Sequence, residues 1–85
     1  MAEILLVEDD PLLVEGLQNA FTFHGHRLEV AGDGLAGVTL AQRHCPDLVL
    51  LDVMLPGPDG FEVCRRLRQS RPDLPVIFLT AKGQE

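Results

Sequence analysis

The sequence contains neither tryptophan nor tyrosine, and only two of its 85 residues are cysteines. Two cysteines are too few for a disulfide framework, and their spacing matches no metal-binding motif. No uninterrupted apolar run exceeds four residues, far short of the roughly 20 that a membrane-spanning helix needs. The start Met1-Ala2-Glu3 also lacks the basic residues and longer apolar region of a signal peptide. We therefore expect a cytoplasmic protein that does not enter membranes.

Basic residues are scarce as well, with 7 Lys and Arg against 13 Asp and Glu and a net charge of −6. This balance argues against direct nucleic-acid binding by this segment, because such affinity comes mainly from neutralising phosphates. The apolar fraction of 46% and the charged fraction of 24% instead indicate a folded core. A chain of this length can form one small domain.

Apolar segments of strand length alternate with segments of helical periodicity. The predicted strands are Ile4–Val7, Arg27–Ala31, Leu48–Asp52 and Val76–Leu79, of which the second is more polar and suits a sheet edge. The predicted helices run from Pro11 to near His24, from Leu35 to His44, and from Phe61 to Gln69. Strands that read as unbroken apolar runs and are joined by helical crossovers are typical of a parallel sheet. The sequence therefore predicts a doubly wound α/β fold in the order β-α-β-α-β-α-β.

The helical spacing also predicts which side chains face the core. The expected inward positions are Leu13, Leu17, Ala20 and Phe21 in the first helix, Val38 and Ala41 in the second, and Phe61, Cys64 and Leu67 in the third. Asp10 before Pro11 is typical of a helix N-cap. Asp33-Gly34 and Asp59-Gly60 are typical of turns in which glycine supplies a positive φ.

Carboxylates follow two of the predicted strands. Asp52 closes the apolar run 48–51, and Glu8-Asp9-Asp10 follows the run 4–7. If these parallel strands are neighbours, at least three carboxylates converge at the carboxyl ends of the strands, where such folds bind ligands. Like charges at short distance are costly unless a cation or a proton joins them, and an all-oxygen site suits Mg²⁺. For Asp10, capping is a simpler explanation than metal binding.

Together, these residues resemble the receiver domain of two-component response regulators. The matching segments are Ile4-Leu5-Leu6-Val7-Glu8-Asp9-Asp10, residues 46–60 (Pro-Asp-Leu-Val-Leu-Leu-Asp-Val-Met-Leu-Pro-Gly-Pro-Asp-Gly) and Leu79-Thr80-Ala81. The resemblance covers essentially the whole chain in order. It implies a flavodoxin-like fold with the strand order 2-1-3-4-5.

The resemblance also implies a signalling activity. Asp52 would be the phosphoacceptor, taking a phosphoryl group from a phosphohistidine of a sensor histidine kinase. The Thr80 hydroxyl and the Ala81 amide would contact the phosphoryl oxygens. Family members catalyse their own phosphotransfer and a slow self-dephosphorylation, so the resemblance implies a phosphoacceptor domain and not an ordinary enzyme.

A metal site is implied by the same resemblance. Asp9 and Asp52 would bind Mg²⁺ directly, Glu8 would do so through water, and the Met54 backbone carbonyl would supply another ligand. Phosphoryl transfer requires mainly alignment and charge stabilisation, which a metal at these oxygens would provide.

The sequence departs from the family at its carboxyl end. A full receiver has five strands and five helices, whereas this sequence stops after the fourth strand, without the fourth helix, fifth strand, fifth helix and the family's lysine. We expect Val76–Leu79 to form an exposed apolar edge and one sheet face to be half bare, so that the chain self-associates. Two functions stay open: a phosphoacceptor domain, and a truncated, non-phosphorylated receiver that acts as a self-associating interaction module.

Overall fold

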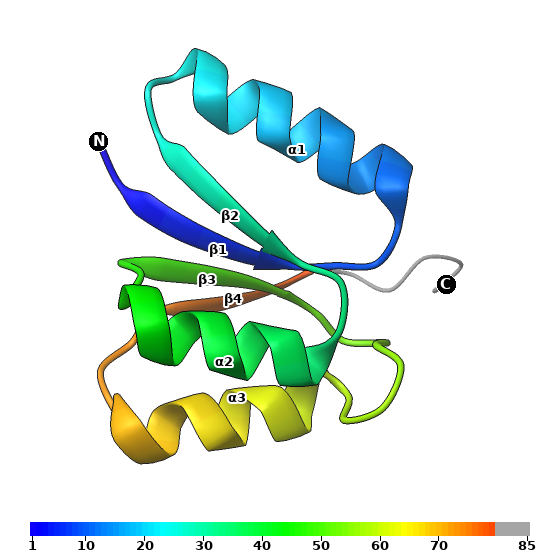
Figure 1. The fold of residues 1–85 in the computed structure, drawn as a ribbon, viewed down its shortest axis with the longest axis vertical. Coiled ribbons are helices and arrows are strands. Elements are labelled where there is room, and N and C mark those ends of the chain that lie inside the picture. Colours follow the sequence, from blue (N-terminus) through cyan, green and yellow to red (C-terminus); the bar gives the residue numbers. More distant parts are fainter. Residues whose placement is uncertain (80–85) are drawn as a thin grey trace.

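Four parallel strands form one sheet, which separates one helix from two others in the computed structural model (Figure 1). The structure describes residues 1–79, so Thr80 and Ala81 lie outside the described residues. The elements are β1 (Glu3–Val7), α1 (Pro11–Phe23), β2 (Arg27–Ala31), α2 (Gly34–His44), β3 (Leu48–Asp52), α3 (Gly60–Ser70) and β4 (Val76–Leu79). The sheet order β2-β1-β3-β4 confirms the predicted doubly wound fold and the edge position of the polar strand.

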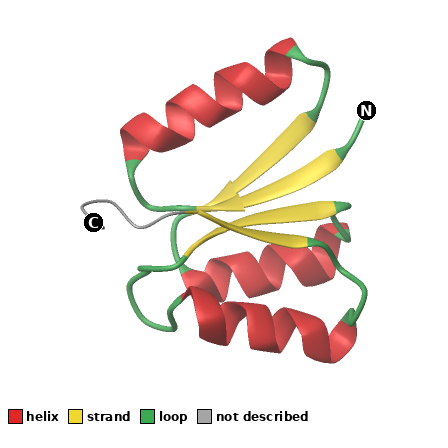
Figure 2. Ribbon diagram, turned by 180° about the vertical axis from the view of Figure 1, so that it is seen from behind, coloured by secondary structure: helices red, strands yellow, loops and turns green. Residues whose placement is uncertain are grey.

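The core has two layers, because successive side chains of each strand point to opposite faces of the sheet. On the face covered by α2 and α3, buried side chains of β1 and β3 pack against those of the helices, among them Leu5, Val49, Leu51, Val63 and Leu67. The face covered by α1 holds a smaller cluster around Ile4, Leu6 and Leu50. Figure 2 shows the two-helix layer and the single helix from behind. No helix among residues 1–79 is long and apolar enough to cross a membrane.

Helix α1 packs through a narrower stripe than the sequence predicts. Val14, Leu17 and Phe21 contact the cluster on its sheet face. Of the other two positions expected to face inward, Leu13 is only half-buried and outside this cluster, and Ala20 is exposed. No residue of α1 is fully buried. The reason is geometric: the contacting positions are three and four residues apart along one line of the helix, and Ala20 lies to one side of that line.

Helices α2 and α3 each begin one residue earlier than predicted, because an aspartate caps each of them. Asp33 Oδ1 accepts a hydrogen bond from the Ala36 N–H at 2.8 Å, and Asp59 Oδ1 accepts one from the Glu62 N–H at 3.0 Å. The glycine after each aspartate is therefore the first helical residue. The expectation of positive φ at these two glycines is wrong; glycines with positive φ among the described residues are Gly25 and Gly57.

The inward face of α3 also differs from the prediction at one position. Gly60, Val63 and Leu67 are buried, and Cys64 packs partly against the same core. Phe61, expected to face inward, is 61% exposed and contacts the Phe78 ring of β4 at a centroid distance of 5.1 Å. The close packing of Gly60 against the backbone of Asp52 and Val53 accounts for this, since it turns the face of Gly60, Val63 and Leu67 inward and Phe61 lies about 100° away from Gly60.

The outer face of α3 carries an ion-paired cluster that predicts a pH effect. Glu62 accepts hydrogen bonds from Arg65 at 2.6 and 3.0 Å and from Arg66 at 2.9 Å. These hydrogen bonds lower the pKa of Glu62 from 4.5 to about 2, and Arg65 has the largest effect. A carboxylate whose folded-state pKa is depressed stabilises the fold above its unfolded pKa, and this contribution disappears as the pH falls towards the folded value.

We expect Glu62→Gln to lower the free energy of unfolding slightly at pH values above 4.5, because the ion pairs are largely exposed. The difference between wild type and variant should shrink as the pH falls from 4.5 to about 2. Urea unfolding at a series of pH values measures it. A difference that stays constant over this range would show that the ion pairs do not stabilise α3.

Candidate functional site

Strands β1 and β3 are direct neighbours, and this pairing brings the predicted carboxylates together. Val7 lies opposite Leu51 in the parallel register, so the next residues, Glu8 and Asp52, lie side by side at the carboxyl ends of the two strands. The Glu8 N–H donates to the Ala31 carbonyl of β2 at 3.0 Å, which extends the sheet pairing by one residue. Backbone hydrogen bonding of the sheet therefore fixes the Glu8 backbone at the end of β1.

Carboxylate oxygens of Glu8, Asp9 and Asp52 all lie within 4.8 Å of one another. Glu8 and Asp52 are only 1% and 2% exposed, whereas Asp9 is exposed. Within residues 1–79, Asp52 Oδ2 is buried without a hydrogen-bond partner, and Oδ1 makes only a long contact of 3.4 Å with the Met54 N–H. Buried oxygens of like charge in this arrangement repel one another, and a hard cation is the group that would best compensate them.

Asp10 has a different role from its two acidic neighbours. Its Oδ1 accepts a hydrogen bond from the Leu12 N–H at 3.0 Å and caps α1. Its backbone N–H donates to Glu8 Oε2 at 3.0 Å and so orients one carboxylate of the cluster. The structure thus confirms capping for Asp10, which does not belong to the group of three carboxylates.

Gly60 allows α3 to pack against the backbone that carries Asp52, a role that was not predicted from the sequence. It is buried, and its N–H donates to the Val53 carbonyl at 2.9 Å. A Cβ at this position would collide with the backbone of Asp52 and Val53. The amino end of α3 can therefore lie directly against the end of β3 only if residue 60 is glycine. The signal in the sequence was the Asp-Gly pair, which marks a capped helix start as readily as a turn.

The acidic cluster borders an open hollow of about 510 Å³ formed mainly by the loop after β3. Its lining includes Asp9, Met54, Pro56 and Phe61. The Met54 side chain is 66% exposed, so its backbone and not its side chain lies next to Asp52. Of the three carboxylates, Asp9 lines this hollow, whereas Glu8 and Asp52 lie buried behind it.

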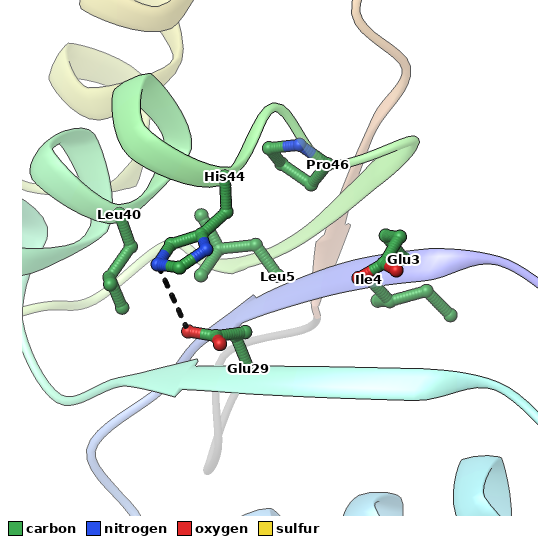
Figure 3. A pocket seen from close by; sticks show the side chains of 7 residues that line it. All are labelled: Glu3, Ile4, Leu5, Glu29, Leu40, His44 and Pro46. Atoms are coloured by element: carbon green, nitrogen blue, oxygen red, sulfur yellow. Dashed lines mark ion pairs between the residues drawn. The ribbon is translucent and has the colours of Figure 1, made fainter.

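A second, much smaller hollow of about 10 Å³ lies where α2 meets β1 and β2 (Figure 3). His44 at the end of α2 points towards Glu29 of β2, and its Nε2 lies 3.9 Å from Glu29 Oε1. In the sequence His44 appeared only as the last residue of a predicted helix, and no pattern indicated this contact. The volume is that of about one water molecule, so the hollow is no candidate for a ligand site.

Comparison with known proteins identifies the family. The sequence model of the response regulator receiver domain matches residues 4–85. The transcriptional regulatory protein AfsQ1 of Streptomyces coelicolor is 47% identical over 85 residues, which are 100% of this chain and 37% of that protein. The response regulator MprA of Mycobacterium sp. strain KMS is 46% identical over 79 residues, 93% of this chain and 34% of its own length. The chain thus spans little more than a third of these relatives.

Solved structures agree with the sequence comparison. The N-terminal domain of a response regulator receiver protein from Methanoculleus marisnigri superposes with a TM-score of 0.90 at 33% identity, over 100% of this chain and 71% of that one. The receiver domain of a sensor histidine kinase from Pseudomonas aeruginosa holds a magnesium ion in its active-site cleft. It superposes with a TM-score of 0.90 at 34% identity, over 99% of this chain and 70% of that one. The chain belongs to the response regulator receiver domain family, a family of two-component signalling domains.

Proposed function

We propose that this domain accepts a phosphoryl group on Asp52 from a phosphohistidine of a sensor histidine kinase. The observation that carries the proposal is the state of the Asp52 carboxylate. One of its oxygens is buried without a hydrogen-bond partner among the described residues, and it lies within 4.8 Å of two further carboxylates. A structural aspartate would satisfy both of its oxygens, whereas a nucleophile needs one that is not engaged.

Mg²⁺ is the cofactor of this proposal, with Asp9, Asp52 and the Met54 backbone carbonyl as direct ligands and Glu8 as a ligand through water. The three carboxylates offer the all-oxygen donor set that Mg²⁺ prefers. The magnesium ion in the cleft of the Pseudomonas receiver domain supports the same choice. When bound, the ion supplies positive charge that offsets the carboxylates and the incoming phosphoryl oxygens.

The residues of the chain then have separate tasks. An Asp52 carboxylate oxygen forms a bond to phosphorus while the phosphorus–nitrogen bond of the donor imidazole breaks, and that imidazole nitrogen takes up a proton from solvent. The Asp10 N–H keeps Glu8 oriented, and Gly60 keeps the end of β3 in place. We assign the remaining phosphoryl contacts to the Thr80 hydroxyl and the Ala81 amide, which lie outside the described residues.

The test is the intact mass of the purified chain after incubation with Mg²⁺ and a small phosphodonor such as acetyl phosphate. We expect a gain of one phosphoryl group, which is absent in Asp52→Asn and absent when the metal is chelated. Asp73→Asn serves as the matched control, because Asp73 is an exposed aspartate far along the chain from the cluster. No gain in a folded wild-type chain would refute the phosphoacceptor function of these 85 residues.

We further propose that the chain corresponds to the N-terminal part of a receiver domain, with the fourth helix, fifth strand and fifth helix of the family outside it. Its coverage of 71% of the Methanoculleus structure supports this correspondence. A cytoplasmic location is part of the same proposal. It rests on Cys45 and Cys64, which are both free thiols, as is usual in reducing compartments.

A second candidate function is self-association through β4 and the adjoining sheet face. Strand β4 is an edge of the described sheet, and its Ile77 and Phe78 side chains are 52% and 38% exposed. Exposed apolar edges favour pairing with another chain. We expect sedimentation to show concentration-dependent dimers at micromolar concentration, which Ile77→Lys weakens. Leu12→Lys, at a 79% exposed position of α1, is the matched control. A strictly monomeric chain with cooperative unfolding would contradict this candidate.

A further inference from the structure

The positive charges of this acidic protein are gathered in one part of the fold. Five of the six arginines within residues 1–79 belong to the last turn of α2, to α3 or to the residue that follows it: Arg43, Arg65, Arg66, Arg68 and Arg71. The sixth, Arg27, is paired with Glu3 at 3.6 Å on the sheet. Glu62 pairs with two of the five, so one carboxylate compensates two guanidinium groups. The surface of α2, α3 and Arg71 therefore carries five arginines and one acidic residue, Glu62, and is flanked by Asp33, Asp59 and Asp73.

A groove of about 170 Å³ runs between α2 and α3 within this surface. Its apolar lining comes from Val38 and Ala41 of α2 and from Leu67 and Leu74, and its polar lining includes Arg66 and Arg71. The volume is roughly tenfold what one ordered water requires, which is enough for an apolar side chain of a partner. An apolar floor bordered by two guanidinium groups suits a ligand that is both apolar and anionic.

Both guanidinium groups keep donors available. Arg66 Nε donates to Glu62 at 2.9 Å, and Arg71 Nη1 donates to the Pro46 carbonyl at 2.6 Å. Within residues 1–79, the other N–H groups of these two side chains have no hydrogen-bond partner. The bonds that exist hold each guanidinium in place beside the groove, and the remaining donors can form the paired hydrogen bonds that carboxylates accept.

We propose that the α2–α3 groove binds an acidic amphipathic segment of a partner protein. Carboxylates of the segment pair with Arg66 and Arg71, and an apolar side chain between them enters the groove above Ala41, Leu67 and Leu74. Complementary charge selects the partner, because a basic or neutral segment would offer no carboxylate to Arg71 or to the remaining donors of Arg66, whose Nε is already paired with Glu62. Arg71 bonds to Pro46, just before β3 begins, so this side of the groove lies near the amino end of β3, whereas Asp52 is at its carboxyl end. The proposal is independent of phosphoryl transfer.

Three synthetic peptides test it by titration into the isotopically labelled full chain, with backbone amide shifts as the readout. The first repeats Glu-Glu-Leu, the second Lys-Lys-Leu and the third Glu-Glu-Ser. We expect saturable binding of the first peptide only, with the largest shifts in α2 and α3. Its affinity should fall as the salt concentration rises from about 50 to about 500 mM, because exposed charges are screened over that range.

Variants distinguish peptide binding in the groove from non-specific attraction between the charges of the peptide and of the protein. Arg66→Gln should weaken binding of the Glu-Glu-Leu peptide about fivefold, while Arg27→Gln, the same charge change on the sheet, should leave it unchanged. Equal binding of the Lys-Lys-Leu peptide, shifts centred on β4, or an affinity unaffected by Arg66→Gln would each overturn the proposal. Shifts in α2 and α3 that grow with the concentration of the chain alone would assign the groove to a second copy and overturn it as well.

Discussion

Asp52→Asn raises the free energy of unfolding by about 1–3 kcal/mol in metal-free buffer, the range expected when a buried, unsatisfied polar group is relieved. The wild-type carboxylate is 2% exposed, has one oxygen without a hydrogen-bond partner within residues 1–79, and lies within 4.8 Å of Glu8 and Asp9 oxygens. Asparagine has nearly the same shape, removes one of three like charges, and offers an N–H donor to the remaining carboxylates. Urea unfolding with a chelator present measures the gain.

Added Mg²⁺ should make wild type more stable than Asp52→Asn. A ligand that binds only the folded state stabilises it in proportion to the logarithm of its concentration above the dissociation constant. Wild type should therefore gain stability with Mg²⁺, and Asp52→Asn should gain much less. Asp73→Asn, the exposed control, should stay within about 0.5 kcal/mol of wild type in both buffers. If Asp52→Asn is less stable than wild type without metal, Asp52 has a structural role and the cluster is not an ion site.

Gly60→Ala lowers the free energy of unfolding by about 1–3 kcal/mol, the usual cost of forcing extra volume into a packed site. The added methyl group would collide with the backbone of Asp52 and Val53, which cannot move aside as a flexible side chain could. Because that backbone carries the Asp52 carboxylate, the variant should also lose part of the stabilisation by Mg²⁺. Thermal unfolding with and without Mg²⁺ measures both effects.

Gly16→Ala is the matched control for this substitution. Gly16 lies within α1, and a Cβ there would meet no heavy atom within 4 Å other than those of its chain neighbours and the adjacent helix backbone. Alanine has a higher helix propensity than glycine, so this variant should be more stable than wild type by about 0.5–1 kcal/mol. We expect the free energy of unfolding to fall in Gly60→Ala and to rise in Gly16→Ala. Similar small effects at both positions would mean that α3 does not press against the end of β3.

The strands and the acidic cluster could be predicted because their signals are local. Each strand is a short apolar run, and Glu8, Asp9 and Asp52 directly follow such runs, so parallel pairing of β1 and β3 brings them together. The polar character of β2 likewise predicted its edge position. That β1 and β3 are neighbours is not a local signal: this part of the prediction came from the strand order that the resemblance to receiver domains implies, and the sheet confirms it.

The positions that were mispredicted depend on how helices lie on the sheet. Ala20 and Phe61 have the apolar character of core residues, but both are exposed, because α1 contacts the sheet along another line of residues and the packing of Gly60 turns Phe61 outward. Gly60 was interpreted as a turn residue, whereas its role is a close approach to the Asp52 backbone. Such contacts join segments whose spacing along the chain carries no periodic signal, so only the three-dimensional structure shows them.

The most direct measurement is to locate the phosphoryl group after incubation with Mg²⁺ and acetyl phosphate, by proteolysis and mass spectrometry of the peptides. We expect one phosphorylated peptide, the one that contains Asp52, with the hydroxylamine sensitivity of an acyl phosphate. Chelation of Mg²⁺ should abolish the modification. A phosphoryl group found on a histidine or on another carboxylate, or modification that persists in Asp52→Asn, would contradict the proposal that this carboxylate cluster is a phosphoacceptor site.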